Sequence, residues 1–167
     1  MAVIIAATLS GVELEQILTS IKHFHGAGRR FEHICEKNGI TIIDDFAHHP
    51  TEIRATLSTA TQMNYSHVWA IFQPYTYSRT AMHLQAFADA LSLADTAIVS
   101  EIMGSREVNN WNVKATQITD LMANGIYIPT FEEICDYILT NAKPGDLIIT
   151  MGGGNVYRCA RMIAEKL

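Results

Sequence analysis

The sequence is poor in cysteine and in basic charge. Three of its 167 residues are cysteines, Cys35, Cys135 and Cys159, and they are too few and too widely spaced for a disulfide framework, which favours a reducing cytosol. We expect each of them to be a small buried apolar residue. Twelve basic residues stand against 17 acidic ones, for a formal net charge of −5. Because no basic surface is available to neutralise phosphates, nucleic acid is not an expected partner.

Long apolar runs are absent too. Residues 2–7, AVIIAA, form the one apolar run near the start, which is too short to span a bilayer and lacks the basic flank of a signal peptide. The protein is therefore expected to be soluble and cytoplasmic, without a membrane partner. Its length and its apolar share of 49% predict a globular chain with a core of its own.

What the sequence does contain is a regular alternation of apolar runs and amphipathic segments. Asn38-Gly39 separates two short runs, and this pair favours a tight hairpin turn. Apolar residues at helical spacing follow the later runs, and Thr130 with Glu133 forms a capping-box pattern. The expected strands are 40–45, 67–72, 96–102, 125–129 and 146–151, and the expected helices are 11–23, 51–62, 80–93, 113–123, one that starts at Thr130, and 155–167.

This rhythm of strand and helix predicts parallel strands joined by right-handed crossovers. The runs are apolar without alternation, as is typical of strands covered on both faces. The predicted fold is therefore α/β. It is a three-layer, Rossmann-like, mostly parallel sheet with helices on both faces, opened by a β-hairpin.

Polar residues gather where the predicted strands end. In open α/β sheets, ligands bind beyond the carboxyl ends of the strands, so the loops at this edge form the candidate site. Four loops contribute to it: Asp44, Asp45, Phe46, His48 and His49; Gln73, Tyr75, Tyr77 and Arg79; Glu101, Arg106 and Glu107; and the segment 152–155.

The stretch DDFAHHP, residues 44–50, has two interpretations. Carboxylates and imidazoles suit zinc or manganese, but adjacent histidines in a turn point apart, and no further cluster of His or Cys has ligand spacing. In the other interpretation, Asp44 or Asp45 accepts hydrogen bonds from backbone amides, and His49 packs ahead of a helix that starts at Pro50. That second interpretation leaves His48 and the other acid unexplained.

Two further segments are candidates for binding an anion. MGGGN, residues 151–155, lacks the third small residue of a dinucleotide fingerprint. A tight turn with Asn155 as helix N-cap is at least as well supported there as an anion at the helix start. Arg29 and Arg30 can offer forked donors to a phosphate. A phosphate loop with its lysine is missing from the sequence.

Four segments in this order, GAGRRFE, DDFAHHPTEIRATL, FQPYTYSRT and EIMGSRE, resemble the C-terminal domain of the Mur ligases. The resemblance covers 25–167, whereas 1–24 resembles the tail of the family's central ATPase domain, and these are the two expected domains. FQPYTYSRT is most similar to the segment of the member that adds L-alanine. The ligase that recycles murein tripeptide differs there.

The resemblance implies a cytoplasmic enzyme of peptidoglycan synthesis. Such an enzyme joins L-alanine to the lactyl carboxylate of UDP-N-acetylmuramate and cleaves ATP to ADP and phosphate. The carboxylate is first phosphorylated, the amine then attacks the acyl phosphate, and Mg²⁺ bridges the phosphates. The family's UDP-sugar domain and central P-loop domain are therefore the implied partners, and this domain would be inactive alone.

By position, the resemblance assigns four residues to ATP. Arg30 matches an arginine that reaches the phosphates or the ribose. Asp45 matches the acid that holds the ribose hydroxyls. Phe46 and His48 would border the adenine, and Phe46 replaces the tyrosine that is usual in the family.

The resemblance assigns three more residues to the amino-acid substrate. Arg79 matches an arginine placed to take the carboxylate of the incoming amino acid, where a forked pairing suits the charge. Tyr75 and His49 would lie beside it. Tyr75 stands where the family usually has histidine, and Thr76 where some members carry a second arginine.

Two other functions remain open from the sequence. One is a stand-alone binding module for a nucleotide or an amino acid. The other is a metallohydrolase that uses the acids and histidines of DDFAHH.

Overall fold

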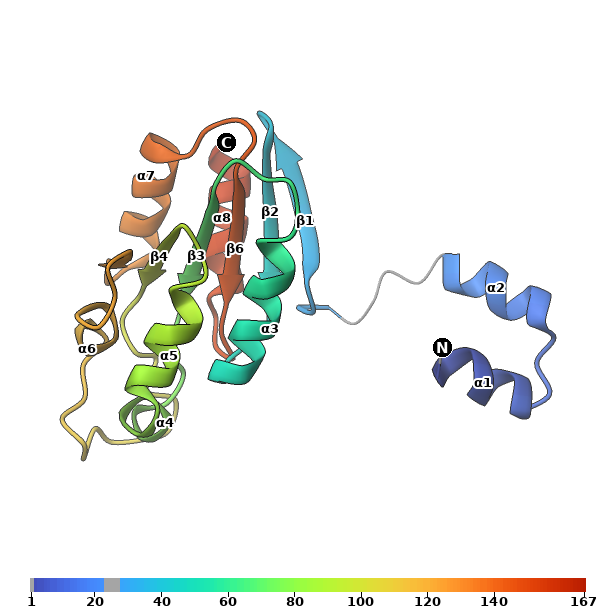
Figure 1. Cartoon of the computed structure of the whole chain (residues 1–167), viewed down its shortest axis with the longest axis horizontal. Helices are drawn as coiled ribbons and strands as arrows, with labels where there is room; N and C mark the ends of the chain where they lie inside the picture. Colours follow the sequence, from blue (N-terminus) through green and yellow to red (C-terminus); the bar gives the residue numbers. More distant parts are fainter. Residues whose placement is uncertain (1, 23–27) are drawn as a thin grey trace.

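The computed structural model describes residues 2–22 and 28–167, and its core is a six-stranded sheet of order β1-β2-β6-β3-β4-β5 (Figure 1). The β1–β2 pair is antiparallel and the other four pairs are parallel, which confirms the predicted sheet. The strands are β1 (Glu32–Lys37), β2 (Ile40–Asp45), β3 (Val68–Phe72), β4 (Thr96–Val99), β5 (Gly125–Tyr127) and β6 (Leu147–Met151).

Helices cover both faces of the sheet, so the three layers are confirmed as well. One face packs around Ile53, Phe87 and Ile118 of α3, α5 and α6, and the other around Ile134 and Ile163 of α7 and α8. β3 and β6 are buried along their whole length, which explains why their sequences are apolar except at Thr150. The helices are α1 (Ala2–Leu9), α2 (Leu14–Lys22), α3 (Pro50–Ala60), α4 (Tyr77–Met82), α5 (Leu84–Leu91), α6 (Thr116–Thr119), α7 (Phe131–Asn141) and α8 (Tyr157–Lys166).

The predicted hairpin turn is confirmed between β1 and β2. Asn38 and Gly39 have φ of 54° and 75°, the left-handed conformation that a two-residue type I′ turn requires at both central positions. The turn also packs closely, because a Cβ on Gly39 would lie 3.0 Å from the Pro144 side chain.

The helix predicted over 80–93 is two helices in the structure. It starts earlier, at Tyr77, because the Thr76 hydroxyl accepts a hydrogen bond from the Arg79 amide at 3.4 Å and caps α4. His83, with φ −129° and ψ 24°, then interrupts the helix before α5 begins. The sequence pattern locates the apolar face of this region but not the break within it.

The helix predicted over 113–123 is only four residues long. Before it, the Asn109 side chain holds Val113 in a loop by two hydrogen bonds, of 2.8 and 3.1 Å. After it, the amides of Leu121 and Met122 bond to carbonyls three residues back, which tightens the chain into turns before β5. Local side-chain hydrogen bonds therefore override the helical spacing of the apolar residues.

The N-terminal residues form two helices that contact each other and that Figure 1 shows apart from the sheet. The apolar run at 2–7 is part of α1. The next helix was predicted from Gly11 and begins at Leu14, whereas its predicted end, His23, lies outside the described residues. Among the described residues, no helix is long and apolar enough to cross a membrane.

The last helix starts later than predicted, and the prediction of Asn155 as its N-cap is wrong. Val156 occupies the cap position without a side-chain hydrogen bond. Asn155 instead uses its main chain, since its carbonyl accepts from the Arg158 amide at 2.9 Å. Its buried Oδ1 makes no hydrogen bond within the described part of the chain.

Candidate functional site

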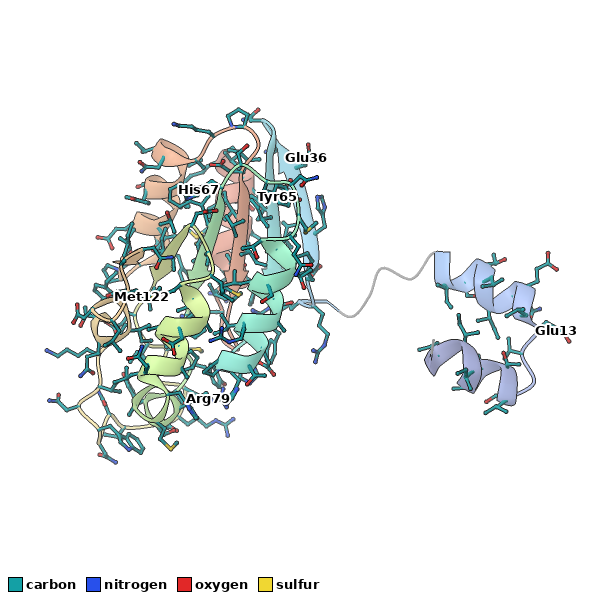
Figure 2. The ribbon with its side chains drawn as sticks, in the orientation of Figure 1. Glu13, Glu36, Tyr65, His67, Arg79 and Met122 are labelled. Carbon is teal, nitrogen blue, oxygen red and sulfur yellow. The ribbon has the colours of Figure 1, made fainter. Side chains whose placement is uncertain are left out.

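The polar loops do meet at one end of the sheet. The Arg79 guanidinium donates to the His48 carbonyl at 3.3 Å, which joins the loop after β3 to the loop after β2. The backbone N–H of Asn155 donates to Gln73 Oε1 at 3.1 Å, which joins the loop after β6 to the loop after β3. Figure 2 shows Arg79 at the opposite end of the sheet from Tyr65, which precedes β3. The loops after β2, β3 and β6 therefore converge at the carboxyl edge, as predicted.

An open cavity of about 300 Å³ lies at this edge, over the start of α3. It brings together all four residues assigned to ATP from the sequence. Its lining is Arg30, Asp45, Phe46, Ala47, His48, Glu52, Ala55 and Thr56. Cation, carboxylate, aromatic ring and imidazole thus share one concave surface, which is the composition expected of a small-molecule site.

Asp45 is held rigidly at the mouth of this cavity. Its Oδ2 accepts from the Phe31 amide and its Oδ1 from the Ala47 amide, both at 2.7 Å. Each carboxylate oxygen has a second lone pair, so Asp45 keeps the capacity to accept hydrogen bonds from two hydroxyls. The backbone-binding interpretation and the ligand-binding interpretation of this acid are therefore compatible.

Asp44 has a different environment, because it is almost fully buried and paired with Arg29. The Arg29 Nε lies 2.8 Å from Asp44 Oδ2, with the aspartate side chain 1% exposed. The remaining Arg29 nitrogens donate to the carbonyls of Gly152 and Gly154 at 2.8 and 3.0 Å. The Thr150 hydroxyl completes the network with a 2.6 Å bond to Asp44. Arg29 thus joins the chain that enters the sheet to the turn after β6.

The two consecutive arginines therefore have separate roles, a division that the sequence analysis missed. Each of the three side-chain nitrogens of Arg29 donates a hydrogen bond within the protein, and the guanidinium also lies 5.1 Å from the ring centroids of Phe46 and Tyr157. Arg30 is exposed and lines the cavity. The assignment of Arg30 to ATP stays a prediction, and its place in the cavity lining is consistent with it.

Phe46 and His48 form an aromatic wall. Their rings meet edge to face at 5.0 Å, and Phe46 is 37% exposed. The Glu52 carboxylate stabilises the His48 end of this wall by accepting a hydrogen bond from the His48 backbone N–H at 2.9 Å. Burial works to raise the pKa of Glu52, but the His48 amide and the histidine charges outweigh it and hold that pKa below its usual value.

His49 caps a helix in the structure. Its Nδ1 accepts from the Thr51 amide at 3.4 Å, and Glu52 completes the capping box at the start of α3. Its ring faces that of His83, 5.2 Å away. Its assignment to the amino-acid substrate stays a prediction, since the exposed part of the ring is still available.

A metal site in DDFAHHP finds no support in this geometry. Within the described residues, no group of three or more His, Cys, Asp or Glu side chains is arranged to hold a metal ion. Asp44 is committed to Arg29, and His49 to its helix. Two of the four candidate ligands of a metallohydrolase, Asp44 and His49, are therefore used for structure.

One residue assigned to the amino acid, Tyr75, lies beside the glycine-rich turn together with His48. A Cβ on Gly153 would lie 3.4 Å from His48 and 3.6 Å from the Tyr75 ring, so this glycine separates the two side chains. Gln73, which the sequence analysis placed only at the rim, is buried and holds the turn through the Asn155 amide. The sequence signal for Gln73 is its position directly after a buried strand.

Residues 29–154 match the family model described as Mur ligase, glutamate ligase domain. The chain belongs to this family. All seven of the residues assigned to ATP or to the amino acid lie within the matched span. So does the Arg29 network, from its first residue to Gly154.

Several curated Mur ligases are similar over nearly the whole chain. The UDP-N-acetylmuramate–L-alanine ligase of Agathobacter rectalis is 44% identical over 170 residues, which cover 99% of this chain and 37% of that protein. The corresponding ligase of Acetivibrio thermocellus is 40% identical, with 99% and 36% covered. The chain spans a little over a third of the length of these relatives.

Solved Mur ligase structures have the same fold. UDP-N-acetylmuramate–alanine ligase MurC from Thermotoga maritima superposes with a TM-score of 0.78 at 27% identity, over 99% of this chain and 36% of that one. A domain from a putative UDP-N-acetylmuramate:L-alanyl-gamma-D-glutamyl-medo-diaminopimelate ligase of Haemophilus ducreyi gives 0.64 at 25% identity, over 82% of this chain and 98% of that one.

Proposed function

We propose that this chain is the C-terminal domain of a UDP-N-acetylmuramate–L-alanine ligase of the bacterial cytoplasm. It closes over the site in which ATP drives the joining of L-alanine to UDP-N-acetylmuramate. The observation that carries the proposal is the contact of Arg79 with the His48 main chain, at the wall of the cavity that Arg30, Asp45 and Phe46 also line. A nucleotide contact and a carboxylate contact thus lie side by side.

On the nucleotide side, the role of each residue follows from its chemistry. Asp45 accepts the ribose hydroxyls with the lone pairs that the backbone leaves over. The Phe46 ring, 37% exposed, offers an apolar face to the adenine together with His48. Arg30 is free to swing toward the phosphates from the exposed rim.

On the amino-acid side, Arg79 supplies the charge. Its guanidinium has five N–H donors, and the His48 carbonyl uses one nitrogen at 3.3 Å, so a forked pair of donors remains for the carboxylate of L-alanine. Tyr75 and Gly153 form the adjoining wall.

A domain of this kind suits the reaction because an acyl phosphate is destroyed by water. Closure after substrate binding excludes solvent and completes the site. The domain has ribose and carboxylate contacts but no phosphate loop with a lysine. Mg²⁺ would be held mainly by another domain, because the acids beside the cavity already bind Arg29 or backbone amides.

The first 24 residues are proposed to belong to the preceding central domain. α1 and α2 carry large apolar side chains on their surface, with Val3 70% and Leu9 83% exposed. An apolar surface of this kind is typical of a helix that packs on something else. The family match, which begins at Arg29, supports a boundary in the segment between α2 and β1.

The test is a pair of substitutions in the complete ligase. Arg79→Ala should raise the KM for L-alanine roughly tenfold or more and leave the KM for ATP nearly unchanged, because a charge-assisted pair to the substrate is lost. Asp45→Asn should raise the KM for ATP by a similar factor. Asparagine is chosen because alanine would also release the two backbone amides.

Asp89→Asn is the matched control, because Asp89 lies on α5 and bonds to Gln85. Both KM values should stay as in the unmodified enzyme. If Arg79→Ala affected ATP and Asp45→Asn affected L-alanine, the two roles would be reversed and the assignment wrong.

A stand-alone binding module predicts a different result. In the proposal, the 167-residue chain mixed with ATP, L-alanine and UDP-N-acetylmuramate releases no phosphate, whereas the complete ligase does. Release of phosphate at an enzymatic rate by this chain alone would contradict the domain assignment. Absence of ligase activity from the complete gene product would support the binding module.

A further inference from the structure

The EIMGSRE segment, which the proposed function leaves without a role, runs alongside the FQPYTYSRT segment. Directly before the EIMGSRE segment, the Ser100 amide donates to the Phe72 carbonyl at 3.0 Å, and within it the Met103 amide donates to the Pro74 carbonyl at 2.9 Å. Further along, Gly104 lies flat on Tyr77, since a Cβ there would be 2.8 Å from the ring. The first segment therefore supports the second along its length.

The last of these contacts involves Glu107 and the first turn of α4. Glu107 Oε2 accepts from the Ser78 amide at 2.8 Å, and Oε1 accepts from the Ser78 hydroxyl at 2.5 Å. The Ser78 amide is one of the donors that a helix cannot satisfy in its own first turn. Thr76 satisfies the next one, at Arg79. Two side chains from two loops thus fix the start of α4.

The residue fixed by this arrangement is the proposed carboxylate clamp. Arg79 directly follows Ser78 in the first turn, so its backbone direction depends on how that turn is held. The hydrogen bond from the Ser78 hydroxyl, with the Ser78 amide and the Arg79 charge, keeps the pKa of Glu107 below its usual value. Glu107 is therefore an ionised acceptor at neutral pH.

We infer that Glu107 is a positioning residue for the amino-acid substrate, which acts by holding the Ser78 turn so that Arg79 faces the carboxylate of L-alanine. This inference rests on the proposed function. A positioning role is expected because small displacements of a substrate-binding group cost far more than the contact that holds it. Glu107 itself need not touch the substrate.

The kinetic test is Glu107→Gln in the complete ligase. The amide keeps the size of the side chain but offers one acceptor oxygen in place of two and loses the charge. The KM for L-alanine should rise roughly fivefold to tenfold, while the KM for ATP should stay within about twofold. Ser78→Ala keeps the hydrogen bond from the backbone N–H of residue 78 to Glu107 and loses only the one from the hydroxyl. It should therefore have a smaller effect of the same kind.

Glu133→Gln is the matched control. Glu133 also accepts hydrogen bonds at the start of a helix, α7, away from the cavity. It should leave the KM for L-alanine unchanged. An equal rise in both variants, or a rise that affects ATP as much as L-alanine, would mean that Glu107 serves general stability, and would overturn the inference.

Hydrogen exchange gives a readout that does not need ligase activity. In the 167-residue chain, the Ser78 amide should exchange about tenfold faster after Glu107→Gln, whereas amides of the central strands should be unaffected. Unchanged exchange at Ser78 would mean that Glu107 does not hold the Ser78 turn, and would overturn the inference.

The KM values of Arg79→Ala and Glu107→Gln distinguish failure of the inference from failure of the proposed function on which it rests. If Arg79→Ala raises the KM for L-alanine and Glu107→Gln does not, only the inference fails. If Arg79→Ala has no effect on L-alanine either, the proposed function fails and the inference fails with it.

Discussion

At the scale of single residues, the two neighbouring arginines show how much the backbone decides. Arg29 has a φ of 58°, a left-handed conformation that is uncommon for a residue with a side chain. It turns the guanidinium back toward Asp44 and the turn after β6. Arg30, one residue on, faces the cavity. One residue stabilises the domain, and the other is available to a ligand.

We therefore expect the two alanine substitutions to differ strongly in their effect on the free energy of unfolding. Arg29→Ala removes one partner of a buried ion pair and leaves the Asp44 charge without compensation, so it should lower the free energy of unfolding by about 3 kcal/mol. Arg30→Ala should change that free energy by less than about 0.5 kcal/mol, as is usual for an exposed position. Urea unfolding of the 167-residue chain measures both.

The comparison of Arg29→Ala with Arg30→Ala can contradict the proposed separation of roles. Equal destabilisation by the two substitutions, or none by either, would contradict the separation of roles. The sequence alone could not separate them, because both residues follow glycine-rich sequence and have the same chemistry. The sequence did place Asp45, Phe46 and His48 at the carboxyl edge of the sheet, since they lie at the end of an apolar run.

At the scale of helices and strands, the hairpin turn is set by conformation as much as by composition. Gly39→Ala should lower the free energy of unfolding by about 1–2 kcal/mol, because φ is +75° and the added Cβ would press on Pro144. Thermal unfolding followed by circular dichroism measures the change.

Gly28→Ala is the control for the turn. Among the described residues, an added Cβ at Gly28 would meet only the Glu32 carboxylate, at 3.7 Å, which is an ordinary contact. The substitution should be close to neutral. A destabilisation as large as that of Gly39→Ala would mean that loss of glycine in general, rather than the turn geometry, determines the effect.

The elements that were predicted well and those that were not differ in one respect. The strands and the Thr130 cap depend on signals within a few residues, and these signals are strong. α6 and the break at His83 depend on loop contacts, such as Asn109 with Val113, that no local periodicity encodes. Loop contacts also hold Gln73 and Glu107, which is why their roles became clear only from the structure.

At the scale of the whole molecule, the sheet with its flanking helices contains every contact described for the site. The α1–α2 pair lies apart from it in Figure 1, and the solved Haemophilus ducreyi domain corresponds to 82% of the chain. Residues 28–167 should therefore fold alone, with a Tm within about 3 °C of the value for the whole chain.

This prediction is checked by deleting 1–27 and following thermal unfolding together with size-exclusion chromatography. The shortened chain should also associate less, because the exposed apolar side chains of α1 and α2 are removed. Loss of cooperative unfolding would show that the N-terminal helices are needed for the fold and would contradict the proposed boundary.

The two outer strands have a consequence for the proposed opening and closing of the domain. β1 closes one side with charged side chains at Glu32, Glu36 and Lys37, and β5 closes the other with only three residues. A short or charged border offers a poor template for pairing with another chain. In the proposed function the domain opens between turnovers, and borders of this kind should keep it from adding strands from neighbouring molecules.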